Sequence, residues 1–164
     1  VSQEFDTNNT FITVNITNGF GNYLFQLEYP DGSTGAFQSS NVFTNLEPGE
    51  YFVNIYDTLG NCSPTQVGPI YIINYPNYFT PNGDGLNDVF FMSGTYDKPY
   101  IMRIYNRLGS EIYFTDNSEP WNGAMFNVGE IVQNGVYVYE IDLDDSDFKG
   151  KTLKGRVTVL RDGR

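Results

Sequence analysis

The chain has 164 residues, with 20 acidic side chains, 9 basic ones and no histidine, so its formal net charge is −11. Such a surface repels phosphate backbones and anionic lipid headgroups, which argues against nucleic acid as a partner. Without histidine the chain lacks the usual general base and the commonest transition-metal ligand, so we expect a protein that is not an enzyme.

The charged residues are unevenly placed along the chain. Residues 1–75 contain seven carboxylates and no lysine or arginine, whereas every basic residue lies from Lys98 onward. A change of composition of this kind indicates a domain boundary, and the length fits two small domains. We therefore predict one domain at residues 1–75 and a second at residues 76–164.

The first half alternates apolar and polar residues with the period of β-strands, between turns such as PDGSTG and EPGE. The predicted strands are 11–17, 23–29, 51–57 and 68–73. The stretch LEPGEY ends in Tyr51 and has the residue order of a tyrosine corner, in which the phenol bonds back to the backbone upstream. This signature favours an immunoglobulin-like sandwich.

The second half continues the same pattern. Its predicted strands are 88–94, 100–106, 111–116, 135–143 and 152–161, and in 135–143 the odd-numbered residues from Tyr137 share one face. Asn106 and Gly109 lie in the turn after the second of these strands and suit positive φ angles. Trp121 lies in a long connection, where it is expected to cover the core rather than to bind a ligand. The predicted fold class is all-β, with two consecutive immunoglobulin-like β-sandwich domains.

The loop NGDGLND, residues 82–88, permits two interpretations. Asn82, Asp84 and Asp88, with carbonyls freed by the glycines between them, offer several of the hard oxygens that calcium requires. The alternative is that these Asn and Asp side chains accept hydrogen bonds from nearby amides and hold an irregular turn. Calcium is the one cofactor that the sequence suggests, and the two alternatives stay open at this point.

Five blocks follow one another after residue 76, namely PNYFTPNGDGLNDVF, IYNRLGSEIYF, WNG, NGVYVYEI and KGRVTVLR. In this order and spacing they resemble the gliding-motility-associated C-terminal domain of Bacteroidota, the type B sorting domain of the type IX secretion system. The first half resembles the repeats of SprB-like adhesins, in which an EPGEY-type turn precedes a strand that ends in a D-x-x-G-x-C pattern, here Asp57, Gly60 and Cys62.

The resemblance implies a signal that directs a large surface adhesin through the type IX secretion system, across the outer membrane and to the cell surface. The implied partners are the type IX translocon and outer-membrane barrel proteins, among them a dedicated barrel of the PorP/SprF type; a small-molecule substrate is not implied. An alternative function is a calcium-dependent adhesive or carbohydrate-binding module, because exposed aromatic residues accompany the acidic loop.

The resemblance also singles out residues for recognition. Arg107 and Arg161 suit contacts with carboxylates of a partner, or alternatively an internal pairing with Asp84 or Asp88. The full set of expected recognition or sorting residues is Pro81, Asn82, Gly83, Asp84, Gly85, Asn87, Asp88, Asn106, Arg107, Gly109, Trp121, Gly135, Tyr137 and Arg161.

Overall fold

The computed structural model describes residues 10–17, 21–60, 63–95, 98–143 and 150–161. These residues form an all-β structure, which confirms the predicted fold class, and they divide into two compact units, Val1–Asn74 with Ser93–Tyr96 and Tyr75–Met92 with Asp97–Arg164. Within the described part of the chain, no helix has the length and apolar character needed to cross a bilayer.

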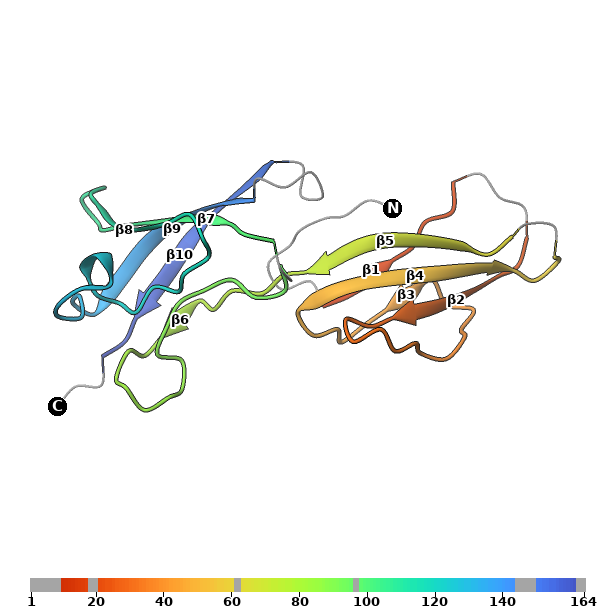
Figure 1. The fold of residues 1–164 in the computed structure, drawn as a ribbon, viewed down its shortest axis with the longest axis horizontal. Coiled ribbons are helices and arrows are strands. Elements are labelled where there is room, and N and C mark those ends of the chain that lie inside the picture. Colours follow the sequence, from red (N-terminus) through yellow and green to blue (C-terminus); the bar gives the residue numbers. More distant parts are fainter. Residues whose placement is uncertain (1–9, 18–20, 61–62, 96–97, 144–149, 162–164) are drawn as a thin grey trace. The chain divides into compact units, whose positions relative to one another are not determined.

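The first unit is a sandwich of two antiparallel sheets (Figure 1). One sheet pairs β1 (Ile12–Thr13) with β3 (Val42–Phe43), and the other has the order β2-β4-β5, with β2 at Tyr23–Glu28, β4 at Gly49–Asp57 and β5 at Thr65–Ile72. Alternate side chains of the strands are buried and form the core: Ile12, Val14, Phe25, Leu27, Phe43, Leu46, Tyr51, Val53, Ile70 and Ile72.

The predicted strands of the first unit are present, with different lengths. The strand expected at 11–17 pairs only over Ile12–Thr13, because its partner β3 is two residues long. Sequence reasoning missed β3, since two residues are too few to show alternation. The strand expected at 68–73 begins earlier, at Thr65.

The second unit is built on one five-stranded sheet in the order β6-β10-β9-β7-β8 (Figure 1). Its strands are β6 (Tyr78–Phe79), β7 (Ile101–Tyr105), β8 (Glu111–Thr115), β9 (Gly135–Leu143) and β10 (Lys151–Val159). Only β6 and β10 are parallel to each other, and the other neighbours are antiparallel. The strand predicted at 135–143 is confirmed to the residue.

The layer that covers this sheet consists of connecting segments. The strand predicted at 88–94 is wrong: within it only Phe90 pairs inside the second unit, through two backbone hydrogen bonds of 2.8 and 2.9 Å with Trp121. The alternation of buried Phe90 and Met92 with exposed Phe91 is present, but Asp88 belongs to the preceding loop and Gly94 has a φ of 89°. A strand pattern without a long partner strand therefore yields only isolated bridges, here Phe90 with Trp121 and Ser93 with Asn74.

Trp121 lies in the core of the second unit. It is fully buried, and its ring contacts Phe79 and Tyr137 at centroid distances of 5.2 and 5.5 Å. The indole N–H donates to the Ala124 carbonyl at 2.7 Å. The expectation that this residue covers the core is confirmed, and a buried indole cannot contact a partner directly.

The tyrosine corner predicted for Tyr51 is confirmed, because its phenol donates to the Glu47 carbonyl at 2.8 Å. The second unit repeats this arrangement, with the phenol of Tyr137 donating to the Gln133 carbonyl at 2.8 Å. Each tyrosine lies near the start of a strand between two neighbours, β4 between β2 and β5, and β9 between β7 and β10. Strand F has this position between strands C and G of the immunoglobulin fold, where the tyrosine corner occurs.

Candidate functional site

The sheet topology gathers most of the expected recognition residues at one end of the second unit. Gly135 at the start of β9 pairs with Val159 at the end of β10, and Val159 also pairs with Phe79 at the end of β6. Because β7 is antiparallel to β9, β7 ends at this same edge. We call the segments that meet here the loop end: the loop 80–88, the turn 106–110, the segment 131–134 and residues 160–161 (Figure 1).

Asp88 holds the loop 80–88 together through its carboxylate. One oxygen accepts hydrogen bonds from the backbone N–H groups of Asn82 at 3.0 Å and Gly83 at 2.7 Å, and the other accepts one from Gly85 at 2.7 Å. The amides of Gly83 and Gly85, and to a lesser extent that of Asn82, hold the pKa of this carboxyl below its ordinary value. The backbone reaches the carboxylate through positive φ angles at Gly83, Gly85 and Asn87.

Asp84 and Asn82 brace the tip of the same loop. The Asn82 amide oxygen accepts from the Asp84 backbone N–H at 3.0 Å, and Asp84 accepts from the Leu86 backbone N–H at 2.8 Å and from the Asn82 side-chain amide at 2.9 Å. Among the described residues no three His, Cys, Asp or Glu side chains are placed to share a metal ion. The geometry seen is that of the turn-holding alternative.

Asn106 shapes the turn 106–110 through its side chain. The predicted positive φ angle at Asn106 is wrong, whereas Gly109 has the expected positive φ, 79°. The Asn106 side-chain oxygen instead accepts from the backbone N–H groups of Leu108 at 2.9 Å and Ser110 at 3.0 Å. This cap leaves Arg107 and Leu108 at the tip, where Leu108 is 83% exposed.

The two arginines expected to act in recognition do not pair with the acidic loop. Arg161 is fixed by its backbone, which donates to the Asn134 side chain at 2.7 Å, and its guanidinium donates to the Ile131 carbonyl at 3.3 Å. Arg107 is exposed and forms no ion pair with any residue that the structure describes. The alternative of internal pairing with Asp84 or Asp88 is therefore not formed.

A groove of about 590 Å³ lies beside the turn and contains four of the expected residues, Asn106, Arg107, Gly135 and Tyr137. Burial raises the pKa of the Tyr137 phenol, and the nearby Arg107 charge partly offsets this effect. Seven further lining residues were missed in the sequence. Five are apolar and two are polar: Leu108, Ile112, Met125, Val132, Val136, Gln133 and Asn134. Two features of the sequence could have indicated the apolar lining: Leu108 lies at the tip of a predicted turn, and the run MFNV lies in a connection between predicted strands.

The remaining expected residues lie outside this groove. The loop 80–88 forms its own part of the loop end. Pro81 packs over Gly123, where an added Cβ would lie 3.0 Å from the proline ring. Gly109 belongs to the turn but does not line the groove, and Trp121 supports the groove from the core through its contact with Tyr137.

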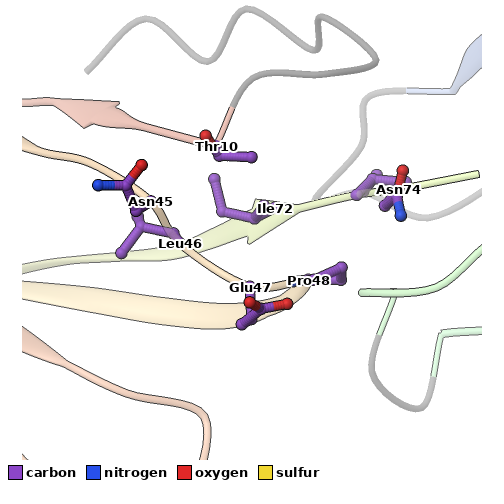
Figure 2. A pocket seen from close by; sticks show the side chains of 8 residues that line it. Thr10, Asn45, Leu46, Glu47, Pro48, Ile72 and Asn74 are labelled. Atoms are coloured by element: carbon purple, nitrogen blue, oxygen red, sulfur yellow. The ribbon is translucent and has the colours of Figure 1, made fainter.

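A second hollow, of about 330 Å³, lies in the first unit beside its tyrosine corner. Figure 2 shows its lining, in which Thr10 precedes β1, Asn45 to Pro48 connect β3 to β4, and Ile72 ends β5. Glu47 is the one ionisable residue of the lining. This arrangement offers neither a nucleophile with a base nor a set of metal ligands.

The described residues form an all-β protein, and its candidate site consists of exposed loops and a groove at one end of the second unit. Residues 73–159 match the family described as the CHU_C type IX secretion signal domain, which is more than half of the chain. The chain therefore belongs to this family and carries a signal for export through the type IX secretion system. The resemblance read from the five sequence blocks is confirmed at this level.

Solved structures resemble the chain only weakly. The BSP domain of a biofilm-associated protein has 17% identity over 96% of this chain and 28% of its own, at a TM-score of 0.34. Three N-terminal domains of the highly immunogenic outer capsid protein of bacteriophage RB49 have 13% identity over 92% and 53%, at a TM-score of 0.31. Dimeric latent PorU from Porphyromonas gingivalis has 16% identity over 88% and 17%, at a TM-score of 0.30. The chain thus spans well under two thirds of each of these chains, and no curated protein sequence matches it.

Proposed function

We propose that this chain is the sorting part of a large surface adhesin. On this proposal residues 76–164 act as a type B sorting domain, and residues 1–75 are an adhesin stalk repeat like those of the gliding adhesin SprB. The observation that carries the proposal is the match of residues 73–159 to the type IX secretion signal family. The protein then functions without catalysis, and its cargo is delivered to the outer face of the outer membrane.

The proposed recognition surface is the loop end. A sorting signal has to stay folded while displaying groups that a receptor contacts, and buried Trp121 and the Asp88 carboxylate supply the rigid support. The proposed receptors are the type IX translocon and a barrel of the PorP/SprF type. Binding and catalytic groups commonly lie on loops held by a rigid scaffold, which is how these segments are arranged.

The test is export of a fluorescent reporter fused in front of residues 1–164 in a gliding bacterium of the Bacteroidota. We expect the reporter at the cell surface or in the medium, and in the periplasm when the translocon is deleted or when the fusion ends at residue 75. Export that persists without the translocon would contradict the proposal. Export that needs the translocon but no PorP/SprF-type barrel would leave the secretion signal standing and refute the type B assignment.

A further inference from the structure

The groove beside Arg107 presents apolar side chains to solvent on an otherwise polar loop surface. Leu108, Met125 and Val136 line it, and they are 83%, 54% and 53% exposed. The volume of about 590 Å³ falls in the range of ligand-binding clefts and has room for a few side chains of a partner. Clustered exposed apolar groups rimmed by polar ones are typical of interaction sites.

The charge of the groove differs from that of the whole protein. The chain has a net charge of −11, yet none of the residues that line the groove is acidic, and Arg107 is its one ionised side chain. Arg107 has no carboxylate partner among the described residues. Arg161 is held at the neighbouring rim, because Asn134, which lines the groove, bonds to its backbone N–H at 2.7 Å. An unpaired guanidinium next to apolar groups suits a carboxylate that itself lies next to apolar groups.

The backbone that displays Met125 is held in a costly conformation. The two residues that follow, Phe126 and Asn127, have φ angles of 50° and 57° without being glycine. The Asn127 side chain fixes this turn by accepting from the Asn122 backbone N–H and donating to the Pro120 carbonyl, both at 2.9 Å. Strained backbone of this kind clusters at functional sites, and a fixed groove loses less entropy on binding.

We propose that this groove binds a peptide segment of the secretion machinery in which carboxylate side chains alternate with aliphatic ones. This inference rests on the proposed function. It adds which side chains the partner presents to the groove, which is one part of the loop end. Arg107 forms the ion pair, and Leu108, Met125 and Val136 receive the aliphatic side chains. A bilayer is the less favoured occupant, because its extended anionic surface would meet the negative charge of the protein around the groove, whereas a short peptide meets only the groove, which has no acidic lining residue.

The binding test uses the whole chain and three fluorescein-labelled peptides of nine residues. One alternates aspartate with valine, one replaces each aspartate with lysine, and one replaces each valine with serine. We expect saturable binding of the aspartate–valine peptide and at least about tenfold weaker binding of the other two. Arg107→Gln and Leu108→Ser should each weaken binding of the first peptide about tenfold.

Two matched variants control for charge and for exposed apolar area. Lys154→Gln also removes one positive charge, from a side chain that pairs with Glu140 on the sheet at 2.8 Å. Leu59→Ser also removes an exposed leucine, from the turn that follows β4 in the first unit. Both controls should bind the first peptide within twofold of the unchanged chain. Equal binding of the lysine and aspartate peptides, no binding of the aspartate peptide at millimolar concentration, or equal losses in the controls would each overturn the proposal.

The same four variants, carried in the reporter fusion, separate this inference from the proposed function. We expect Arg107→Gln and Leu108→Ser to reduce export and Lys154→Gln and Leu59→Ser to leave it unchanged. If the unchanged fusion is exported and Arg107→Gln and Leu108→Ser are exported equally well, the proposed role of the groove is refuted and the proposed sorting function stands. Two other outcomes are association of the chain with itself and binding of the chain to vesicles of anionic phospholipid. If Leu108→Ser abolishes either interaction, the groove has another occupant and the proposal is refuted.

Discussion

The hydroxyl of Tyr137 donates a hydrogen bond of 2.8 Å to the carbonyl of Gln133, four residues upstream, and both residues line the groove of the loop end. The bond ties the start of β9 to the segment that precedes it. Its counterpart in the first unit joins Tyr51 to Glu47 with the same spacing and the same length. The tyrosine corner therefore has a structural task in both units and, in the second, also shapes the candidate site.

Tyr137→Phe should destabilise the second unit by about 0.5–1.5 kcal/mol, the usual net value of one hydrogen bond. The ring and its contact with Trp121 are kept, so the change isolates the hydroxyl. Urea unfolding followed by tryptophan fluorescence measures the effect, because Trp121 is the one tryptophan of the chain. Tyr51→Phe is the matched control and should leave this fluorescence transition unchanged. Equal shifts of the transition in both variants would contradict a role confined to each unit.

Trp121→Ala should cost about 3–5 kcal/mol, as expected for removing a large aromatic side chain from a core. The indole is fully buried against Phe79 and Tyr137, so the cavity would open beneath the loop end. Thermal unfolding by circular dichroism measures the loss. Phe126→Ala removes an aromatic ring that is 53% exposed, and it should change stability by less than about 0.5 kcal/mol. A comparable loss in the two variants would mean that Phe126 is also part of the packed core.

The amino-acid sequence predicts the parts of this fold whose determinants are local. The strand at 135–143 is predicted correctly because the alternation continues over most of its nine residues, and the Tyr51 corner because it is coded in the short stretch LEPGEY. The strand predicted at 88–94 does not form, because pairing depends on which distant segment lies opposite. Only two isolated bridges are present there, Phe90 with Trp121 and Ser93 with Asn74. Asn106 illustrates the same limit, since its side chain can either accept amide hydrogen bonds or permit positive φ.

The candidate site was also predicted only where its determinants are local in the sequence. Four of its lining residues were predicted through the resemblance, but the apolar lining was not, because Leu108, Met125 and Val136 come from three separate segments. Only the sheet order brings those segments together. Whether an apolar side chain is exposed depends on the folded chain. Periodicity in the sequence alone would assign such residues to a core.

Asp88→Asn should lower the melting temperature of the second unit at neutral pH, and this difference from the unchanged chain should become smaller in acid. The amides of Gly83, Gly85 and Asn82 hold the carboxyl pKa below its ordinary value of 3.8, so the ionised form stabilises the fold above that value. The contribution falls as the pH drops below 3.8 and the folded carboxyl becomes protonated. Melting temperatures at pH 7 and pH 3 for both proteins, with an NMR titration of the carboxyl carbon, measure the effect. Asp116→Asn changes an exposed carboxylate that accepts no hydrogen bond from a described residue, and it should have little effect at either pH.

The second unit should also become less stable in alkali, because of its buried phenols. Burial, with a smaller contribution from Glu119, raises the pKa of Tyr113 from its ordinary value of 10 to about 12, and burial raises the pKa of Tyr139 further. The unfolded phenols ionise above pH 10 while the folded ones stay neutral, so the stabilisation is complete below pH 10 and is lost as the pH rises through 12. The Tyr113 hydroxyl also donates to the Glu119 carbonyl at 2.7 Å, a bond that ionisation removes. Between pH 8 and 12 the melting temperature should fall, and the absorbance of phenolate should rise over the same range of pH. Tyr113→Phe should flatten the decline, and an unchanged decline would mean that other groups, such as Tyr139, control the alkaline transition.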